Sequence, residues 1–278
     1  MTVNLLPDQG MLRTCRIQRV VTHSSSVKSF CLPRLFDAVP GQFVNLWIPG
    51  VDEKPLSISG MRSEAMELSV KAVGPFTRRL LECGAGDWVG IRGPFGNGFT
   101  LEPHAVLVGG GIGIAPIRFL AQVMADRAIP FTLVCGARTK EELIFESELR
   151  GWECHLSTDD GSCGSCGLVT DLLDGLVEKH PVSTLCAAGP EPMLLRIVEF
   201  ADRHSLPYQV SFERYMKCGI GVCGSCCLDG SGIRLCVEGP VLNRDQVRQV
   251  TEFGLPHRDA SGRRPPLDGL RSPSSTPP

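Results

Sequence analysis

The sequence has no excess of basic residues. Its 28 lysine and arginine residues face 30 aspartate and glutamate residues, which gives a formal net charge of −2 at pH 7. Proteins that hold nucleic acid through its phosphates carry a basic patch and a high isoelectric point, whereas this chain has an isoelectric point near 6.3. We therefore expect no nucleic-acid partner.

Long apolar runs and a secretory signal are also missing. No apolar run approaches the roughly 20 residues that a membrane-spanning helix needs, and the start, MTVNLLPDQGM, lacks the basic and apolar regions of a signal peptide. We therefore expect a cytoplasmic protein without a membrane segment. The first strand-like run begins just after Met11, so the natural start stays open between Met1 and Met11.

The pattern of apolar residues changes near residue 104. Before it, short apolar runs are bounded by turn residues, and several such strands predict a β-sandwich or barrel. After it, buried strands alternate with amphipathic stretches, and this alternation predicts a parallel sheet covered by helices. We expect these helices over residues 115–127, 140–149, 167–180 and 191–204.

These patterns divide the 278 residues into four parts. They are a β-domain over 11–101, an α/β domain over 102–212, a cysteine-rich module over 213–245 and a tail over 255–278. The tail is rich in proline and serine and has too few apolar residues to join a core, so we expect it to be disordered.

Five of the 13 cysteines lie in one stretch of twenty residues, KCGIGVCGSCCLDGSGIRLC. Cys218, Cys223 and Cys226 follow the spacing C-x4-C-x2-C, and Cys236 comes after nine intervening residues. This is the ligand spacing of plant-type [2Fe–2S] clusters, in which four thiolates hold the iron. We therefore predict that these four cysteines bind the cluster and that Cys227 points away from it.

Two other uses of these thiols compete with the cluster. Four cysteines also suit tetrahedral zinc, but structural zinc sites commonly use two C-x2-C pairs, and this segment has one. A disulfide framework is disfavoured because the number of cysteines is odd and the sequence has no secretory signal. The glycines favour the cluster, because a loop around iron must turn sharply and point N–H groups at the sulfurs. Zinc stays the alternative.

A second glycine-rich stretch, GGGIGIAPI over residues 109–117, stands where a strand gives way to a helix. Such a turn lets the backbone approach a pyrophosphate, and the N–H groups at the start of the helix face the anion. The third glycine of G-x-G-x-x-G is replaced by Pro116, which suits the first turn of a helix. Close packing of strand against helix is the alternative reason for these glycines.

Two stretches of the β-domain carry candidate phosphate and flavin contacts. In EKPLSIS, Lys54 could meet a phosphate and Ser57 could hydrogen-bond a flavin, although both residue types are commonly just solvated. In VGPFTRRLL, Thr77 could either cap the helix that follows or donate to a phosphate at its N-terminus. The residues alone leave these alternatives open.

Acidic residues after the strand ECHLST bear on the choice of nucleotide. Asp159 and Asp160 stand where an acid can accept ribose hydroxyls and repels a 2′-phosphate, so they favour NAD over NADP. Arg138 argues for NADP, because an arginine can receive that phosphate. The nearby Cys163 and Cys166 form a C-x2-C pair, which we interpret as reduced thiols without a metal.

The stretches KPLSIS, VGPFTRRL, GGGIGIAPI and AGPEPML occur in the order found in the ferredoxin–NAD(P) reductase superfamily, which the chain resembles over about residues 12–243. With the cysteine-rich stretch added, it resembles the family of electron-transfer subunits of class B dihydroorotate dehydrogenase. The resemblance implies an N-terminal antiparallel β-barrel that binds FAD, a parallel α/β nucleotide-binding domain that binds NAD, and a small C-terminal [2Fe–2S] module. It also implies a partner, the FMN-containing catalytic subunit, in a hetero-oligomer such as a heterotetramer.

The resemblance assigns the family's cofactor-binding stretches to particular residues of this sequence. The flavin stretch falls on Lys54, Pro55, Leu56 and Ser57, the flavin pyrophosphate stretch on Gly74 and Thr77, and the nicotinamide-nucleotide site on Gly109, Gly110, Gly111, Gly113, Gly189 and Pro190. Two positions depart from the family. Lys54 stands where arginine is usual, and it keeps the charge but loses the bidentate fork. Ala188 stands where the family has a cysteine near the nicotinamide, with Cys186 two positions earlier.

The cofactors make sense together as a relay. A nicotinamide exchanges two electrons as hydride, a [2Fe–2S] cluster exchanges one at a time, and FAD can do both. We find no further group of residues suited to substrate catalysis and name no catalytic residue. We therefore expect a subunit that transfers electrons while a partner subunit binds the substrate. The resemblance implies electron flow from dihydroorotate to NAD⁺ in pyrimidine biosynthesis. A sulfide dehydrogenase, hydrogenase or ferredoxin–NADP enzyme is the alternative client, and a zinc-bearing docking module is the alternative class.

Overall fold

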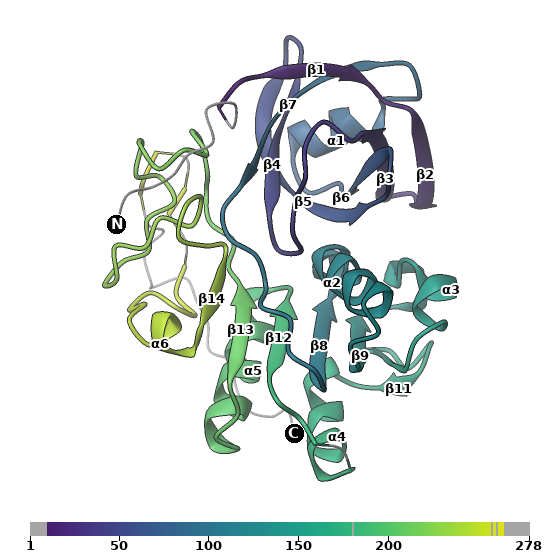
Figure 1. The fold of residues 1–278 in the computed structure, drawn as a ribbon, viewed down its shortest axis with the longest axis vertical. Helices are drawn as coiled ribbons and strands as arrows, with labels where there is room; N and C mark the ends of the chain where they lie inside the picture. Colours follow the sequence, from purple (N-terminus) through teal and green to yellow (C-terminus); the bar gives the residue numbers. More distant parts are fainter. Residues whose placement is uncertain (1–9, 180, 257, 260, 264–278) are drawn as a thin grey trace, which may run out of the picture.

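The structure is a computed structural model that describes residues 10–179, 181–256, 258–259 and 261–263. Within these residues the chain forms two seven-stranded sheets stacked one above the other, with the cysteine-rich segment along one side of both (Figure 1). The tail predicted over 255–278 lies largely outside the described residues, as does the alternative start at Met1.

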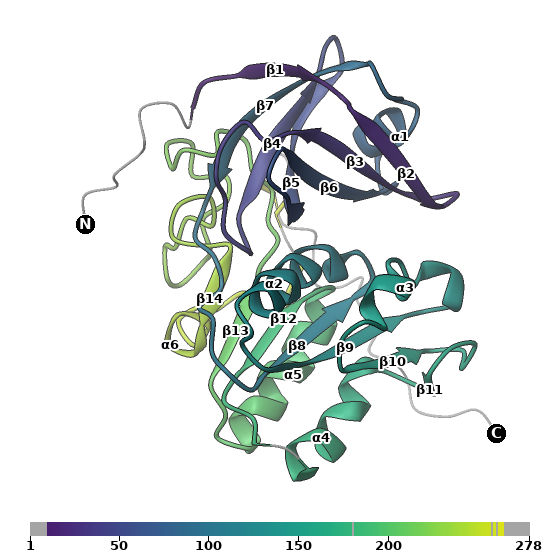
Figure 2. The same cartoon turned by 45° about the vertical axis from the view of Figure 1, so that its right-hand side comes forward.

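The first sheet is antiparallel and curves into a half-barrel (Figure 2). Its elements are β1 (Arg13–Arg16), β2 (Arg19–Ser24), β3 (Val27–Pro33), β4 (Phe43–Ile48), β5 (Asp52–Met61), β6 (Ala65–Lys71), helix α1 (Pro75–Leu81) and β7 (Trp88–Phe95). The strands lie in the order β1-β7-β4-β5-β6-β3-β2. Alternate residues of β4, Val44 and Leu46, share one buried core with Phe76 and Leu80 of α1. The predicted N-terminal antiparallel barrel is confirmed in this form.

The second sheet is parallel except at one edge. Its strands are β8 (Ala105–Gly110), β9 (Phe131–Ala137), β10 (Cys154–Thr158), β11 (Ser165–Cys166), β12 (Leu185–Ala188), β13 (Tyr208–Ser211) and β14 (Val241–Asn243). They lie in the order β11-β10-β9-β8-β12-β13-β14, and β14 runs antiparallel to β13. The direction of strand addition reverses between β8 and β12, which creates a switch point there. The predicted parallel α/β domain is confirmed, and β14 ties the cysteine-rich segment to its edge.

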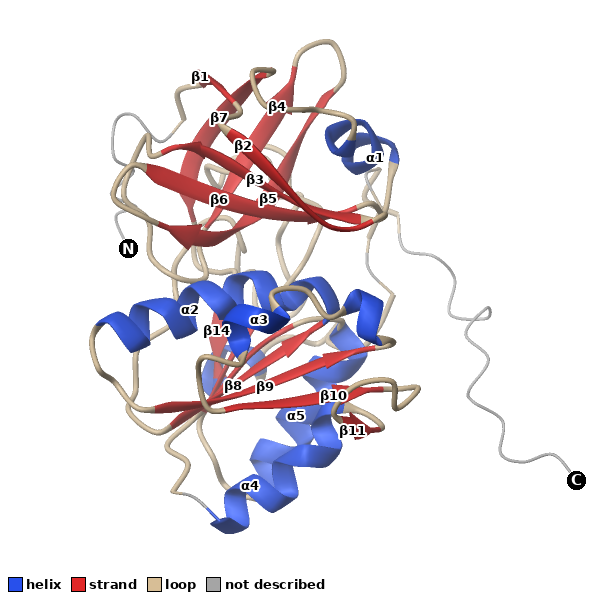
Figure 3. Ribbon diagram, turned by 90° about the vertical axis from the view of Figure 1, so that its right-hand side faces the viewer, coloured by secondary structure: helices blue, strands red, loops and turns tan. Residues whose placement is uncertain are grey.

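Helices cover both faces of the second sheet (Figure 3). The face toward the half-barrel carries α2 (Ile114–Asp126) and α3 (Glu146–Leu149), the other face carries α4 (Leu173–Lys179) and α5 (Glu191–Arg203), and α6 (Arg244–Val247) follows β14. In the part of the chain that the structure describes, each helix is too short or too polar to cross a membrane.

The helix predicted over residues 140–149 is broken in two, so the expectation of one continuous helix was wrong. A 3₁₀ turn, Lys140–Glu142, is separated from α3 by residues 143–145, of which Leu143 is extended with a ψ of 98° and Phe145 has a φ of +65°. A left-handed residue with a side chain is strained and does not continue a right-handed helix. The ring of Phe145 packs instead against the guanidinium of Arg118, which lies 4.3 Å from the ring centroid.

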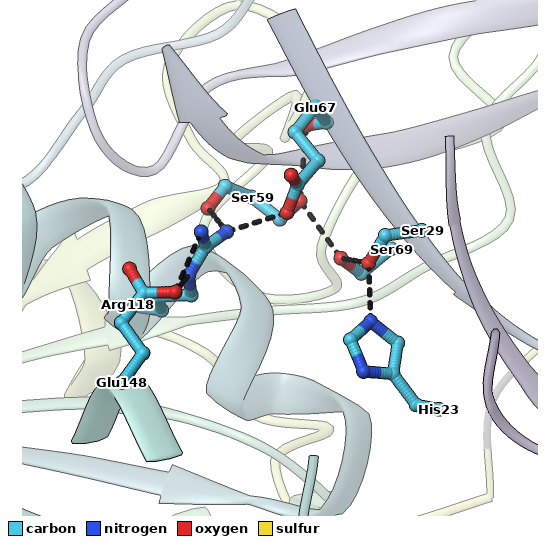
Figure 4. A network of polar contacts seen from close by, with 7 residues as sticks. All are labelled: His23, Ser29, Ser59, Glu67, Ser69, Arg118 and Glu148. Atoms are coloured by element: carbon cyan, nitrogen blue, oxygen red, sulfur yellow. Dashed lines mark hydrogen bonds and ion pairs between the residues drawn. The ribbon is translucent and has the colours of Figure 1, made fainter. Parts of the chain in front are cut away.

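A buried arginine joins the two layers (Figure 4). The side chain of Arg118 on α2 is 4% exposed, and its Nη1 donates to the carbonyl oxygen of Ser59 at 3.1 Å and to Glu67 at 2.5 Å, both on the half-barrel. Its Nε donates to Glu148 of α3 at 2.9 Å. Because a buried charge is stable only when its hydrogen bonds are satisfied, these contacts fix the half-barrel against α2.

Candidate functional site

A cavity of about 620 Å³ opens at the carboxyl ends of β8, β9 and β12, and we call it the nucleotide cavity. Its lining includes Gly110, Gly111, Gly113, Asp159, Gly189 and Pro190, all of which the sequence assigned to nucleotide binding. It lies at the switch point between β8 and β12, where open α/β sheets bind their ligands. Its volume is within the range of cofactor pockets.

Close contacts surround two of these glycines, and at Gly113 they are with backbone atoms, which cannot move away. A Cβ atom on Gly110 would lie 2.3 Å from the sulfur of Met193, and one on Gly113 would lie 2.3 Å from the carbonyl oxygen of Ala188. Bare backbone therefore lines the cavity along the 3₁₀ turn Gly111–Gly113, which leads directly into α2. The unpartnered N–H groups are those at the start of this continuous helical segment. This surface fits an approaching pyrophosphate.

Three other residues at this end of the sheet have packing roles. Gly109 does not line the nucleotide cavity, and a Cβ atom there would lie 2.8 Å from Ile114. Ala188 is buried next to the glycine loop. Cys186 is 1% exposed, lies outside the cavity lining, and burial raises its pKa to about 12. Cys186 is therefore a neutral core thiol and does not replace the cysteine for which Ala188 stands.

The carboxyl ends of β9 and β10 bring Asp159 and Arg138 to the same wall of the nucleotide cavity. The Asp159 amide donates to the carbonyl oxygen of Ala137 at 3.0 Å, and the Asp160 amide donates to that of Arg138 at 3.2 Å. The carboxylate of Asp160 accepts from the Ser162 hydroxyl at 2.6 Å. Asp159, which favours NAD, and Arg138, which favours NADP, are thus neighbours. The side chain of Asp160 is instead hydrogen-bonded to Ser162.

The predicted flavin stretch, residues 54–57, lies within β5. Lys54 Nζ is 2.5 Å from the carboxylate of Asp52 and 5.5 Å from the ring centroid of Tyr215. The hydrogen bond from Lys54 lowers the pKa of Asp52, which is therefore ionised at neutral pH. A phosphate would have to compete with Asp52 for the lysine, and contact between Lys54 and phosphate stays a prediction.

A buried amide stands beside this stretch. Asn45 of β4 lies in register with Pro55 and is 1% exposed. Its Nδ2 donates to the carbonyl oxygen of Lys217 at 3.1 Å, while its Oδ1 is a buried acceptor with no hydrogen-bond partner among the described residues. Buried polar atoms are normally satisfied, so this acceptor fits a ligand that brings an N–H donor, as a flavin ring does.

Thr77 caps helix α1. Its hydroxyl oxygen accepts hydrogen bonds from the amides of Val73 at 2.9 Å and Gly74 at 3.0 Å. Of the two roles that the sequence left open, the structure therefore contains the cap. A Cβ atom on Gly74 would have no atom within 4 Å, so this backbone is open to a ligand. Its assignment to the flavin pyrophosphate stays a prediction.

Arg92 of β7 joins the half-barrel to the cysteine-rich segment. Its Nε donates to Glu53 at 2.7 Å, and its Nη1 donates to the carbonyl oxygen of Cys218 at 3.1 Å. The ring of Phe95 lies so close to Gly219 that a Cβ atom there would be 2.8 Å from it. The first predicted cluster ligand is thereby held next to the strands that carry the flavin stretch.

The structure brings the predicted cluster ligands together in pairs. Cys226 Sγ is 3.3 Å from Cys236 Sγ, and the amide of Cys223 donates to Cys218 Sγ at 3.5 Å. Burial alone would raise the pKa of Cys223, but hydrogen bonds with Ser225 and Cys218 hold it at about 6. The hydrogen bond from Cys236 lowers the pKa of Cys226 to about 7.

Thiolates are the form that binds iron, so Cys223 and Cys226 suit a cluster, whereas the hydrogen bond with Cys226 raises the pKa of Cys236, which would have to lose its proton on binding iron. In the described part of the chain, no group of three or more possible ligands is arranged to hold a metal ion as it stands. The assignment of Cys218, Cys223, Cys226 and Cys236 as ligands therefore stays a prediction.

The remaining loop cysteines have other surroundings. Cys227 forms an isolated β-bridge with Arg234, and burial raises its pKa. The amide of Cys163 donates to the Thr158 hydroxyl at 2.9 Å, and Cys166 is exposed in β11. All 13 cysteines lie within the described residues and are free of disulfides.

Comparison with known proteins agrees with this arrangement. Residues 213–248 match the iron–sulfur cluster binding domain of dihydroorotate dehydrogenase B, and residues 107–198 match the oxidoreductase NAD-binding domain. The chain is 42% identical over 252 residues to the probable dihydroorotate dehydrogenase B (NAD(+)), electron transfer subunit, of Methanocaldococcus jannaschii, across 90% of this chain and 96% of the relative. The chain belongs to the family of dihydroorotate dehydrogenase B electron transfer subunits. A member from Methanothermobacter thermautotrophicus is 44% identical over 258 residues, with the same coverage.

Family membership confirms the resemblance seen in the sequence. The chain is an oxidoreductase subunit of electron transfer, with an NAD-binding domain followed by an iron–sulfur-binding domain. Among solved structures, one titled as the NADH-dependent reduced ferredoxin-NADP oxidoreductase is 29% identical with a TM-score of 0.76, over 86% of this chain and 93% of that one. A ferredoxin NADP⁺ reductase from Neisseria gonorrhoeae is 18% identical with a TM-score of 0.58, over 68% and 91%, and shows the shared fold.

Sequence reasoning missed three residues of the site, Asn45, Arg92 and Glu142. The partners of Asn45 and Arg92 lie 172 and 126 positions away, so no local pattern reveals them. Glu142 left a detectable signal, because it follows Arg138 by four residues, a spacing at which opposite charges commonly pair.

Proposed function

We propose that this chain relays electrons between an FMN-containing dihydroorotate dehydrogenase catalytic subunit and NAD, through a [2Fe–2S] cluster and FAD that it binds. One observation carries the proposal. The family's iron–sulfur-binding domain, residues 213–248, follows an NAD-binding domain in a chain that is 42% identical to electron transfer subunits over 90% of its length. Hydrogen bonds from Arg92 and Asn45 join the cysteine-rich segment directly to the half-barrel.

The proposed sites use the residues described above. The flavin is assigned to Lys54, Pro55, Leu56, Ser57, Gly74 and Thr77, the nucleotide to Gly109, Gly110, Gly111, Gly113, Asp159, Gly189 and Pro190, and the cluster to Cys218, Cys223, Cys226 and Cys236. Gly109 supports the nucleotide site from behind, since it packs against the first residue of α2.

The chain's own residues would bind and orient the cofactors. A bound FAD would supply the exchange between two-electron and one-electron chemistry. The bare backbone at Gly110 and Gly113 admits a pyrophosphate to the start of α2. Asp159 can accept hydrogen bonds from ribose hydroxyls. Arg92 and Asn45 hold the backbone of residues 217–218 against the half-barrel, which keeps the cluster segment near the flavin stretch.

Reconstitution with the catalytic subunit tests this function. Alone, the chain loaded with FAD and cluster is expected to pass electrons from NADH to an artificial acceptor and to leave dihydroorotate unoxidised, because we assign its FAD to exchange with NAD and identify no base for that substrate among the described residues. After mixing with the FMN-containing subunit, NAD⁺-linked dihydroorotate oxidation should appear. Turnover of dihydroorotate by the isolated chain, or no NAD⁺ linkage in the mixture, would contradict the proposal.

A second client is favoured by one observation. The solved structure titled as an NADH-dependent reduced ferredoxin-NADP oxidoreductase aligns over 86% of this chain. The same assay distinguishes the two clients when reduced ferredoxin replaces the FMN-containing subunit. Fast NAD⁺ reduction with ferredoxin and none with the FMN-containing subunit would assign the chain to the ferredoxin client instead.

We also propose a cytoplasmic location and the division of the chain into parts over 11–101, 102–212, 213–245 and 255–278. The location is supported by thirteen cysteines without a disulfide, as expected of a reducing compartment. The division is supported by the half-barrel and the parallel sheet, which have separate strand orders.

A further inference from the structure

One carboxylate pairs with two cations at the wall of the nucleotide cavity. Glu142 accepts a hydrogen bond from Nε of Arg138 at 3.2 Å, pairs also with Nη2 of that guanidinium, and lies 3.3 Å from Nζ of Lys71. All three side chains line the cavity together with Asp159. Lys71 is the last residue of β6, so this contact also joins the half-barrel to the loop after β9.

The four side chains balance in charge. Hydrogen bonding from Arg138, opposed by burial and aided by Lys71, lowers the pKa of Glu142, which is therefore ionised at neutral pH. The two cations and two carboxylates of this group then sum to no net charge, and the rest of the lining adds one cation, Arg196, and one acid, Glu213. A ribose hydroxyl adds no charge, whereas a 2′-phosphate brings about −1.5 to −2 at pH 7. That phosphate would meet Asp159 while both cations are paired with Glu142.

Exposure indicates how large the effect should be. The Arg138 side chain is 70% exposed, whereas Glu142 and Lys71 are 22% and 23% exposed. Exposed ion pairs are weak, so the pair between Arg138 and Glu142 alone would be little obstacle to a 2′-phosphate that competes for the arginine. Glu142 is a larger obstacle because it is mostly buried, pairs with Lys71 as well and stands next to a second acid, Asp159. A change of about tenfold in affinity is the expected scale, since that corresponds to about 1.4 kcal/mol.

We propose that Glu142 is a specificity-determining residue for the nucleotide, because it engages the two cations that a 2′-phosphate would need at this wall. The inference rests on the proposed NAD site. Asp159 and Glu142 then act in different ways. Asp159 repels a 2′-phosphate directly, and Glu142 keeps Arg138 and Lys71 from attracting it.

Flavin reduction measures the effect in the chain loaded with FAD and cluster. Stopped-flow reduction by NADH and by NADPH gives the ratio of apparent second-order rate constants. Glu142→Gln should raise the NADPH/NADH ratio about tenfold, mainly through tighter NADPH binding. Adding Arg138→Met to that variant should remove most of the gain. Glu141→Gln is the matched control, because Glu141 is the adjacent acid, is exposed and does not line the cavity.

Calorimetry gives a second readout that does not depend on electron transfer. Glu142→Gln should tighten the binding of 2′,5′-ADP about tenfold and leave the binding of ADP within twofold. An unchanged ratio in Glu142→Gln with flavin and cluster in place would overturn the inference, as would an equal gain in Glu141→Gln. If the unaltered chain binds neither ADP nor NADH, the proposed function fails and this inference fails with it. If NADH reduces the flavin normally and Glu142→Gln leaves the NADPH/NADH ratio of rate constants unchanged, the inference alone is refuted.

Discussion

The chain has two glycine-rich loops, and Gly113 of one loop and Gly224 of the other are glycine for different reasons. In the nucleotide loop, Gly113 has a φ of −62°, a backbone conformation open to any residue. Its side chain is excluded by space, because a Cβ atom would lie 2.3 Å from the carbonyl oxygen of Ala188. In the cysteine-rich loop, Gly224 has open space within 4 Å but a φ of +72°. There the left-handed backbone conformation, which Gly111 of the nucleotide loop also adopts at a φ of +53°, disfavours residues with a side chain.

This difference follows from what each loop would bind. A pyrophosphate must approach the backbone itself, so two chain segments and the ligand meet at close range. A cluster is held by side-chain thiolates, so the backbone has to fold back on itself to aim several of them inward. Substitutions at glycine and cysteine should therefore separate crowding from conformational strain.

Removing a cluster ligand should have the largest effect. Single substitutions to serine at Cys218, Cys223, Cys226 or Cys236 are expected to abolish the [2Fe–2S] absorbance, because each removes one of four thiolates. Cys227→Ser is the matched control and should keep the spectrum. Iron and acid-labile sulfide analysis of anaerobic preparations decides it. Stoichiometric zinc without iron, or loss of the cluster in Cys227→Ser alone, would show that the ligand assignment is wrong.

The cluster ligands could be predicted from the cysteine spacing because that pattern is local in the sequence. Most of the fold could be predicted from local patterns too. Period-two runs before residue 104 and strand–helix alternation after it predicted both sheets. The single helix expected over 140–149 failed, because the left-handed Phe145 is set by its contact with Arg118 in another element. Local propensity carries no information on such a contact.

The site shows the same division between local and distant information. The glycine loop and Asp159 were predicted, because each follows a strand at a recognisable distance. Arg92 and Asn45 were not predicted, since their partners in the cysteine-rich segment become neighbours only after both sheets have formed. The capping role of Thr77 became visible only with coordinates, through the amide of Gly74, and its contact with a phosphate stays a prediction.

Gly113→Ala should give the next largest effect, in the nucleotide loop. The added methyl group would meet backbone atoms, which cannot rotate away, so we expect a loss near the upper end of the about 1–3 kcal/mol that overpacking costs. NADH reduction of the flavin should fall by more than tenfold. Gly175→Ala in α4 is the control, since a Cβ atom there has no atom within 4 Å and alanine favours the helix. Unfolding by denaturant and stopped-flow reduction check both; an unimpaired Gly113→Ala would refute the crowding argument.

Gly224→Ala should give the smallest effect, in the cysteine-rich loop. Its methyl group has room, so the cost is the left-handed conformation, about 1 kcal/mol. Gly224→Asn should cost less, because asparagine tolerates that conformation better than alanine. Gly232→Ala is the matched control: Gly232 has a φ of +69° and equally open surroundings but lies outside the C-x4-C-x2-C spacing.

Both alanine variants should lower the unfolding midpoint by a similar amount, since the strain is the same. Only Gly224→Ala should also shift the electron paramagnetic resonance spectrum of the reduced cluster, because Gly224 stands between Cys223 and Cys226. If Gly224→Ala and Gly232→Ala shift that spectrum equally, the C-x4-C-x2-C stretch has no special place around the cluster. If neither variant changes stability, strain is not the reason for glycine at Gly224 and Gly232, and the contrast with Gly113 is lost.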